Sequence, residues 1–182
     1  MTAKSRTMRC PRLCCLLLTS VVCYAAAAAQ EAVSLPANGG FEQLDGRTGL
    51  PAGWTLWNAS RNLTAYTLAA AHSGVAAACV TDDNATDSQG LRSPRVPVTA
   101  GQTVLATGVV LIDDLQAGGF AIYLEFWRGD QRLANFSAST AERGRWVELK
   151  LQQAVPADAT EATVLIYGSS ATIGRAYFDD VR

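Results

Sequence analysis

The protein has 182 residues, 49% of them hydrophobic, and its 15 Lys and Arg against 16 Asp and Glu give a net charge of −1. Four of the basic residues and none of the acidic ones precede position 30, so residues 30–182 hold 11 basic and 16 acidic side chains, a net charge near −5. This balance argues against nucleic acids and anionic membranes as partners, because both attract basic patches, and it leaves neutral ligands open.

The first 29 residues are typical of an export signal. Four basic residues come first, an apolar run follows over about residues 13–24, and the small residues of "AAAAAQ" suit a signal peptidase. The apolar run is shorter than the roughly 20 residues that a membrane-spanning helix requires. We therefore expect a signal peptide over residues 1–29 and a secreted protein, extracellular or periplasmic, without membrane insertion.

Residues 30–182 contain a single cysteine, Cys79, because the other four lie in the expected signal. One cysteine cannot form an internal disulfide, so the exported part must be stabilised by its hydrophobic core. About 150 residues are enough for one domain with such a core. We expect one domain over residues 30–182.

Short segments rich in β-branched and aromatic residues follow the signal, separated by turns rich in Gly, Asp and Pro. In chain order they are "WTLWN", "NLTAYTL", "VAAACV", "TVLATGVVLI", "FAIYLEFW", "RWVELKL", "ATVLIYG" and "RAYFDDV". No helical pattern of useful length lies between them. Strands at this spacing are typical of an antiparallel sandwich. The predicted fold class is all-β, an antiparallel β-sandwich jelly roll.

Alternation within "FAIYLEFW" separates two faces of that strand, because successive side chains point to opposite sides. The apolar face, which we expect in the core, carries Phe120, Ile122, Leu124 and Phe126. The opposite face carries Ala121, Tyr123, Glu125 and Trp127. In "ATVLIYG", Tyr167 also lies on a face that alternates with Val164 and Ile166. Two strands thus place aromatic residues on a face that the core does not need.

Several motifs occur in an order that resembles carbohydrate-binding modules of families 4, 9 and 22. They are "LPANGGFEQLDGRTGLPAGW", "AHSGVAAACV", "QGLRSPRVPVTAGQTVLATGVV", "GRWVELKLQQAVPADATEATVLIYG" and "AYFDDV". The resemblance extends over residues 33–181. It implies a galactose-binding-like jelly roll in which the first and last strands are neighbours, and it places Trp54 and Trp146 in the core.

The same resemblance implies a structural calcium ion where the two ends meet. Its ligand positions correspond to Glu42 in "GGFE" and Asp179 in "FDDV". Calcium takes six to eight oxygen ligands, in which backbone carbonyls supplement carboxylates. Asp180 is a secondary candidate, because in a regular strand it points away from Asp179. The alternative is that these acids are exposed charges or hydrogen-bond caps.

A sugar would suit the non-core face. Aromatic side chains can cover the apolar C–H face of a pyranose ring, while polar groups bind the hydroxyls at its edge. The predicted ligand-binding residues are Tyr123, Glu125, Trp127, Tyr167 and Trp57, with Arg92 and Asn135 as weaker candidates for hydroxyl contacts. Replacing Trp127 by Ala is expected to remove polysaccharide binding without loss of stability.

The sequence therefore predicts a secreted, non-catalytic module that binds a polysaccharide or oligosaccharide. An alternative is a surface protein-contact or structural β-sandwich domain. A glycoside-cleaving enzyme is a further alternative, but it needs two carboxylates at a set separation, and no motif specifies such a pair. The chain ends one residue after "FDDV", so we expect a fragment or accessory module whose partner is a catalytic domain of a larger polysaccharide-degrading protein.

Overall fold

The computed structural model of the protein describes residues 36–57, 64–67, 70–169 and 171–182, and for residues 64–67 it describes the backbone alone. This part of the chain contains thirteen strands and no helix, hence no helix that could cross a membrane. The signal peptide expected over residues 1–29 lies outside the described residues.

The first of two larger sheets, which we call the β9 sheet, has the strand order β10-β9-β12-β6-β3, and β7 also pairs with β12. Its members are β3 (Thr55–Leu56), β6 (Gln89–Arg92), β7 (Val96–Pro97), β9 (Phe120–Arg128), β10 (Gln131–Thr140) and β12 (Glu161–Gly168). Every pair in this sheet is antiparallel.

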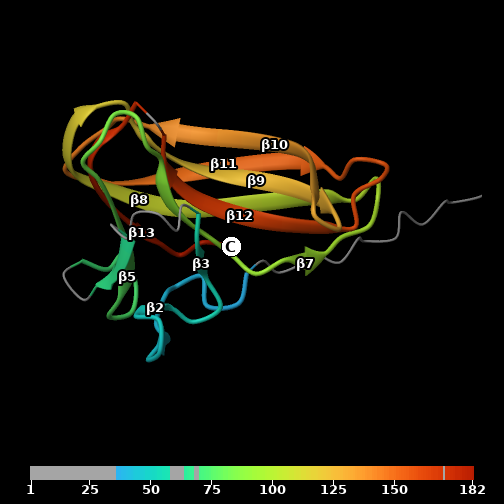
Figure 1. The fold of residues 1–182 in the computed structure, drawn as a ribbon, viewed down its shortest axis with the longest axis horizontal. Coiled ribbons are helices and arrows are strands. Elements are labelled where there is room, and N and C mark those ends of the chain that lie inside the picture. Colours follow the sequence, from blue (N-terminus) through green and yellow to red (C-terminus); the bar gives the residue numbers. More distant parts are fainter. Residues whose placement is uncertain (1–35, 58–63, 68–69, 170) are drawn as a thin grey trace, which may run out of the picture.

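The second larger sheet, the β8 sheet, has the order β11-β8-β13-β5-β4 and is also antiparallel. Its members are β4 (Thr64–Thr67), β5 (Ala77–Asp82), β8 (Thr103–Ala117), β11 (Trp146–Ala154) and β13 (Ile173–Asp179). A small third sheet pairs β1 (Leu44–Asp45) with β2 (Leu50–Pro51). The long strands of both larger sheets run along the long axis of the molecule (Figure 1). The predicted all-β jelly-roll sandwich is confirmed.

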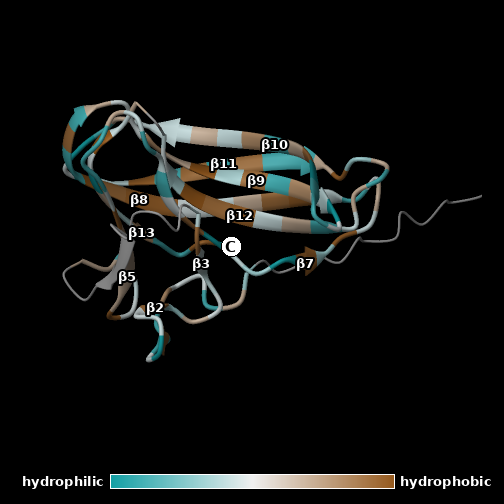
Figure 2. Cartoon of the chain, in the orientation of Figure 1, coloured by the Kyte–Doolittle hydropathy of each residue, from teal (hydrophilic) through white to brown (hydrophobic). Residues whose placement is uncertain are grey.

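The core lies between the two larger sheets. The predicted core face of β9 is confirmed, since Phe120, Ile122, Leu124 and Phe126 are all 0% exposed. Val110 and Ile112 of β8 and Val164 and Ile166 of β12 belong to the same buried cluster. The alternation that produces this arrangement is visible as bands of hydrophobic and hydrophilic residues along the long strands (Figure 2).

The two ends of the described domain meet, but the expectation that the first and last strands are neighbours is corrected, because β1 pairs with β2 in the small sheet and β13 pairs with β5 and β8. The backbone N–H of Val181 donates to the carbonyl of Gly39 at 2.9 Å, and Arg182 exchanges two backbone hydrogen bonds with Thr107 at 2.9 and 2.8 Å. Gly39 is required by this approach, because a Cβ atom there would lie 1.8 Å from the carbonyl oxygen of Val181. The closing strand β13 lies between β8 and β5, inside its sheet.

Strand β10 is absent from the segments that the sequence pattern singled out. It pairs with β9 along nearly its whole length, but the register shifts between Arg132 and Ala134. This bulge places one extra residue in β10 and breaks the period-two alternation by which a strand is recognised. As a consequence, Arg132 and Asn135 lie on the same face although one position is even and the other odd.

Trp146 does not lie in the core, which corrects the expectation from the resemblance. Leu149 and Leu151 of β11 are 5% and 7% exposed and face inward, so alternation turns Trp146 outward. Its ring contacts His72 instead, at 5.4 Å between centroids. Trp54, by contrast, is 4% exposed as expected, and its ring lies 4.9 Å from that of Phe41.

Candidate functional site

The outer face of the β9 sheet collects the aromatic residues that the sequence singled out. Tyr123 on β9 stands between Ser137 of β10 and Leu165 of β12, and Glu125 stands opposite Asn135 and Thr163. Alternation alone explains this placement, because the inward positions of both strands are filled by core residues.

Glu125 lies at the centre of this face and is 0% exposed. Arg92 donates to its carboxylate through Nε at 2.7 Å and Nη2 at 3.3 Å, and Arg132 donates through Nη1 at 2.7 Å. The hydroxyl of Thr163 adds a fourth hydrogen bond at 3.0 Å. A buried carboxylate is tolerated only when it is paired and hydrogen-bonded in this way. Glu125 therefore holds the two arginines in place, and its oxygens are already occupied.

Trp127 lies beneath the arginines and is 9% exposed. Its indole N–H donates to Thr163 Oγ1 at 3.0 Å. The guanidinium carbons of Arg92 and Arg95 lie 5.0 and 4.6 Å from its ring centroid, within the range of cation–π attraction. The structure thus places Trp127 and Glu125 on the predicted face but under other side chains, where they support the arginines.

Three other predicted residues come together beside Arg132. Tyr123 and Tyr167 meet edge to face at 5.2 Å, and Tyr167 meets Trp57 at 6.0 Å. They border a hollow of about 200 Å³, which we call the aromatic hollow, and its lining is Trp57, Tyr123, Arg132, Asn135, Leu165 and Tyr167. The sequence analysis did not predict Arg132 and Leu165 as site residues. Leu165 could have been found, because it alternates with Val164 and Ile166 and therefore lies on the same face as Tyr167.

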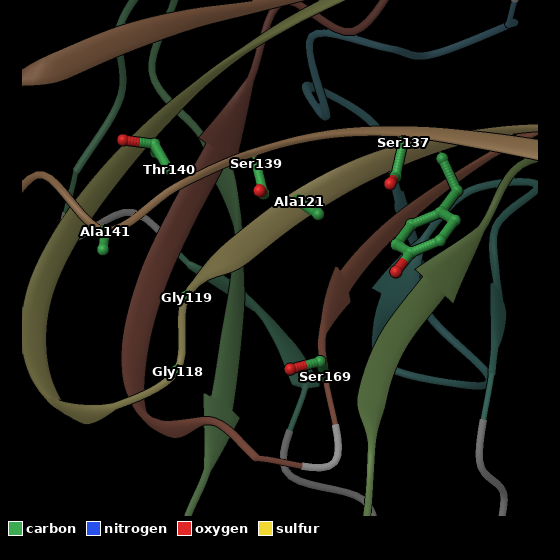
Figure 3. A pocket seen from close by; sticks show the side chains of 9 residues that line it. Gly118, Gly119, Ala121, Ser137, Ser139, Thr140, Ala141 and Ser169 are labelled. Carbon is green, nitrogen blue, oxygen red and sulfur yellow. The ribbon is translucent and has the colours of Figure 1, made fainter.

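A second hollow continues along the same face. It has a volume of about 370 Å³, and Tyr123 borders both hollows. Small and hydroxyl-bearing residues line the rest of it, among them Ser137, Ser139 and Ser169 (Figure 3). We call it the serine hollow. The two hollows together form a surface that is aromatic at one end and rich in hydroxyl groups at the other.

A third hollow of about 370 Å³ borders the β8 sheet, near Asp82, Asp83 and Asp114. No aromatic residue lines it. The chemistry that suits a sugar ring is therefore found on the β9 sheet and not here.

The predicted metal-binding acids converge on one turn. Glu42 accepts hydrogen bonds from the backbone N–H groups of Val75 at 3.1 Å and Ala76 at 3.2 Å. Asp179 Oδ2 accepts from the N–H groups of His72 at 2.8 Å and Ser73 at 3.0 Å. The two carboxylates thus hold the turn 72–76 against the two ends of the domain.

Asp180 joins the same turn, contrary to the expectation that it points away from Asp179. Strand β13 ends at Asp179, and Asp180 takes a left-handed backbone conformation with φ of 48°. Its carboxylate therefore reaches His72 Nδ1 at 2.7 Å and Ser73 Oγ at 2.9 Å. The regular-strand assumption fails here because the strand has already ended.

Calcium is compatible with this donor set. Asp179 is 0% exposed, burial raises the pKa of its carboxyl, and within the described ranges neither it nor Glu42 forms an ion pair with Lys or Arg. A cation would offset the cost of that burial. The described residues hold no group of three or more His, Cys, Asp or Glu arranged to bind a metal.

No protein-family model matches the chain, and no curated protein matches it. Solved structures do share its fold. The second family 22 module of Paenibacillus barcinonensis Xyn10C, a xylan-binding domain, is 16% identical with a TM-score of 0.55, over 74% of this chain and 92% of that one. TmCBM61, solved with β-1,4-galactotriose, is 19% identical with a TM-score of 0.51, over 80% of this chain and 94% of that one.

A third similar structure is the enzymatically active domain of tailspike protein 4 of bacteriophage CBA120. It is 12% identical with a TM-score of 0.60, and the match covers 80% of this chain but 20% of the tailspike chain. Together these likenesses show that the chain has the jelly-roll fold of carbohydrate-binding modules.

Proposed function

We propose that the protein is a secreted, non-catalytic carbohydrate-binding module that holds a polysaccharide or oligosaccharide against the outer face of the β9 sheet. The observation that carries the proposal is the aromatic hollow. Trp57, Tyr123 and Tyr167 present ring surface there beside the amide of Asn135 and the guanidinium of Arg132.

The chemistry of this lining suits a sugar. A pyranose ring combines apolar C–H faces with a rim of hydroxyl groups, so its site needs aromatic surface together with a few hydrogen-bonding groups. The serine hollow adds hydroxyl groups next to Tyr123, so a chain of several sugar units has further contacts along the same face. The jelly-roll modules with a similar fold, one xylan-binding and one solved with a galactotriose, support this assignment.

Catalysis fits the site less well. A glycosidase needs one carboxyl group that carries a proton and a second that does not. Glu125 is the acid at the centre of this face, and its oxygens already accept hydrogen bonds from two arginines and Thr163. The lining of the two hollows on this face contributes no other acidic residue within the described part of the chain. The similarity to the enzymatically active domain of the tailspike protein covers 20% of that chain, so most of that chain has no counterpart in the match.

Two further parts of the proposal rest on the sequence and the ends of the fold. The pattern typical of an export signal in residues 1–29 supports a secreted module, and an attached catalytic domain of a larger protein is its proposed partner. Calcium is proposed as a structural ion at the turn 72–76, next to Glu42 and Asp179.

Affinity electrophoresis of the purified protein through gels that contain plant, algal and animal polysaccharides tests the proposal. We expect retardation by at least one class of glycan. Tyr123→Ala should weaken that binding at least about 10-fold, or ~1.4 kcal/mol, because the side chain of Tyr123 lines both hollows. Tyr177→Ala is the matched control, since Tyr177 is a partly exposed tyrosine on the β8 sheet.

Free migration of the folded protein in every gel would contradict carbohydrate binding and favour a protein-contact domain. Equal losses for Tyr123→Ala and Tyr177→Ala would show that the ligand lies elsewhere.

A further inference from the structure

The aromatic hollow has a positive charge at its rim. The group that comprises Arg92, Arg132 and the buried Glu125 holds two positive charges and one negative charge. Glu161, the nearby acid on β12, already pairs with Arg95 at 3.1 Å. The charge of the group is therefore not cancelled by the described residues that line the hollow.

The arginines also keep unused hydrogen-bond donors. Each guanidinium carries five N–H donors in a rigid fork, and the bonds to Glu125 use Nε and Nη2 of Arg92 and Nη1 of Arg132. Nη1 of Arg92 and Nε and Nη2 of Arg132 take no part in the bonds to Glu125. The side chain of Arg132 is 39% exposed and lines the hollow. Its free edge can therefore reach a bound molecule.

This edge is fixed in direction. Glu125 anchors Arg132 from below, and the guanidinium of Arg92 lies 4.4 Å from the ring centroid of Trp57, with that of Arg132 at 5.9 Å. A guanidinium that is held in place loses little further entropy when it binds a ligand, and its planar fork matches a carboxylate better than a hydroxyl group.

We infer that the aromatic hollow selects a sugar unit that bears a carboxylate, a uronic acid, over its neutral counterpart. This inference rests on the proposed carbohydrate-binding function. The sugar ring would lie against the aromatic side chains, with its carboxylate toward Arg132. The negative net charge of the chain opposes a general attraction for polyanions, so the preference has to come from this local contact.

The test compares uronate polymers, polygalacturonate and alginate, with the neutral polymers made by reducing their carboxyl groups. At least one uronate polymer should bind about 10- to 100-fold more tightly than its reduced form, the range expected for a charge-assisted hydrogen bond. Arg132→Gln should remove the preference, so that a uronate polymer and its reduced form bind with nearly equal affinity. Arg132→Lys keeps the positive charge but lacks the planar guanidinium that can bind both oxygens of a carboxylate, so it should retain part of the preference.

Arg128→Gln is the matched control, because Arg128 lies at the end of the neighbouring strand β9, its side chain is 54% exposed, and it contacts Asp158 and Gln131 instead of the hollow. It should bind as the unchanged protein does. Thermal unfolding checks that each variant folds. If Arg132→Gln does not fold, Arg132→Lys and the comparison of uronate with reduced polymers still decide the question.

Binding of neutral glycans with equal or greater affinity would overturn the preference and leave the proposed function intact. Binding of neither polymer class would overturn the preference, and the proposed function would be overturned as well only if no glycan of the wider panel bound. If dextran sulfate competes as strongly as the uronate polymers, the site attracts anions unspecifically and the preference is overturned. The same holds if Arg128→Gln loses as much uronate binding as Arg132→Gln does.

Discussion

At the scale of single residues, Trp127 and Tyr123 leave the same strand on the same face but meet different surroundings. Tyr123 borders both hollows, whereas Trp127 is covered by the guanidinium groups of Arg92 and Arg95. Alternation specifies the face of a residue but not which long side chains fold over it. The expectation that the sequence supports for Trp127, a loss of binding without a loss of stability, therefore changes once the structure is known.

We expect Trp127→Ala to lower the free energy of unfolding by about 3 kcal/mol, the usual cost of removing a large buried aromatic ring. The change also removes the hydrogen bond to Thr163. Chemical denaturation measures this loss, and Trp127→Phe, which keeps most of the ring, should lose less. Unchanged stability together with abolished binding would mean that the ligand reaches the indole directly.

At the scale of elements, two irregularities shape the site and the ends of the domain. The bulge in β10 brings Arg132 and Asn135 to one face, which a regular strand would not do. The close approach of Gly39 to Val181 lets the first described segment reach the closing strand. Both are local departures from regular geometry that a pattern with period two does not reveal.

Gly39→Ala should destabilise the domain by about 1–3 kcal/mol, the typical cost of overpacking, because its Cβ would fall 1.8 Å from a backbone oxygen that cannot move aside alone. Gly46→Ala is the control, since a Cβ there meets nothing within 4 Å. Urea denaturation compares the two. Similar stability for both variants would show that the ends do not pack as described.

At the scale of the whole molecule, three acids from the two ends hold one internal turn. Glu42 follows the first described residues, and Asp179 and Asp180 lie near the last. All three bind the turn 72–76, so the turn connects the ends of the chain to the rest of the fold. A cation at this point would strengthen the closure of the entire domain.

If calcium binds there, excess calcium should raise the melting temperature and EGTA should lower it. A free calcium concentration of about 100 times the dissociation constant adds ~2.7 kcal/mol to the free energy of unfolding. For a domain of this size, this corresponds to a rise in melting temperature of about 5–10 °C. Glu42→Gln should reduce the effect, and magnesium serves as the control ion. Identical melting curves in calcium and EGTA would rule out the ion and leave the acids as acceptors for backbone N–H groups.

The sequence by itself determined the all-β fold class and the core face of β9, because alternation and turn residues are local properties of the chain, whereas the meeting of the two ends was an expectation from the family resemblance. It also identified Tyr123, Tyr167 and Trp57, which the structure brings together at one hollow. Only the tertiary structure decided that Glu125 is sealed by two arginines, that Trp127 is covered, and that Asp180 turns toward His72. These outcomes depend on a bulge, on the end of a strand and on contacts between distant segments, none of which has a local signature in the chain.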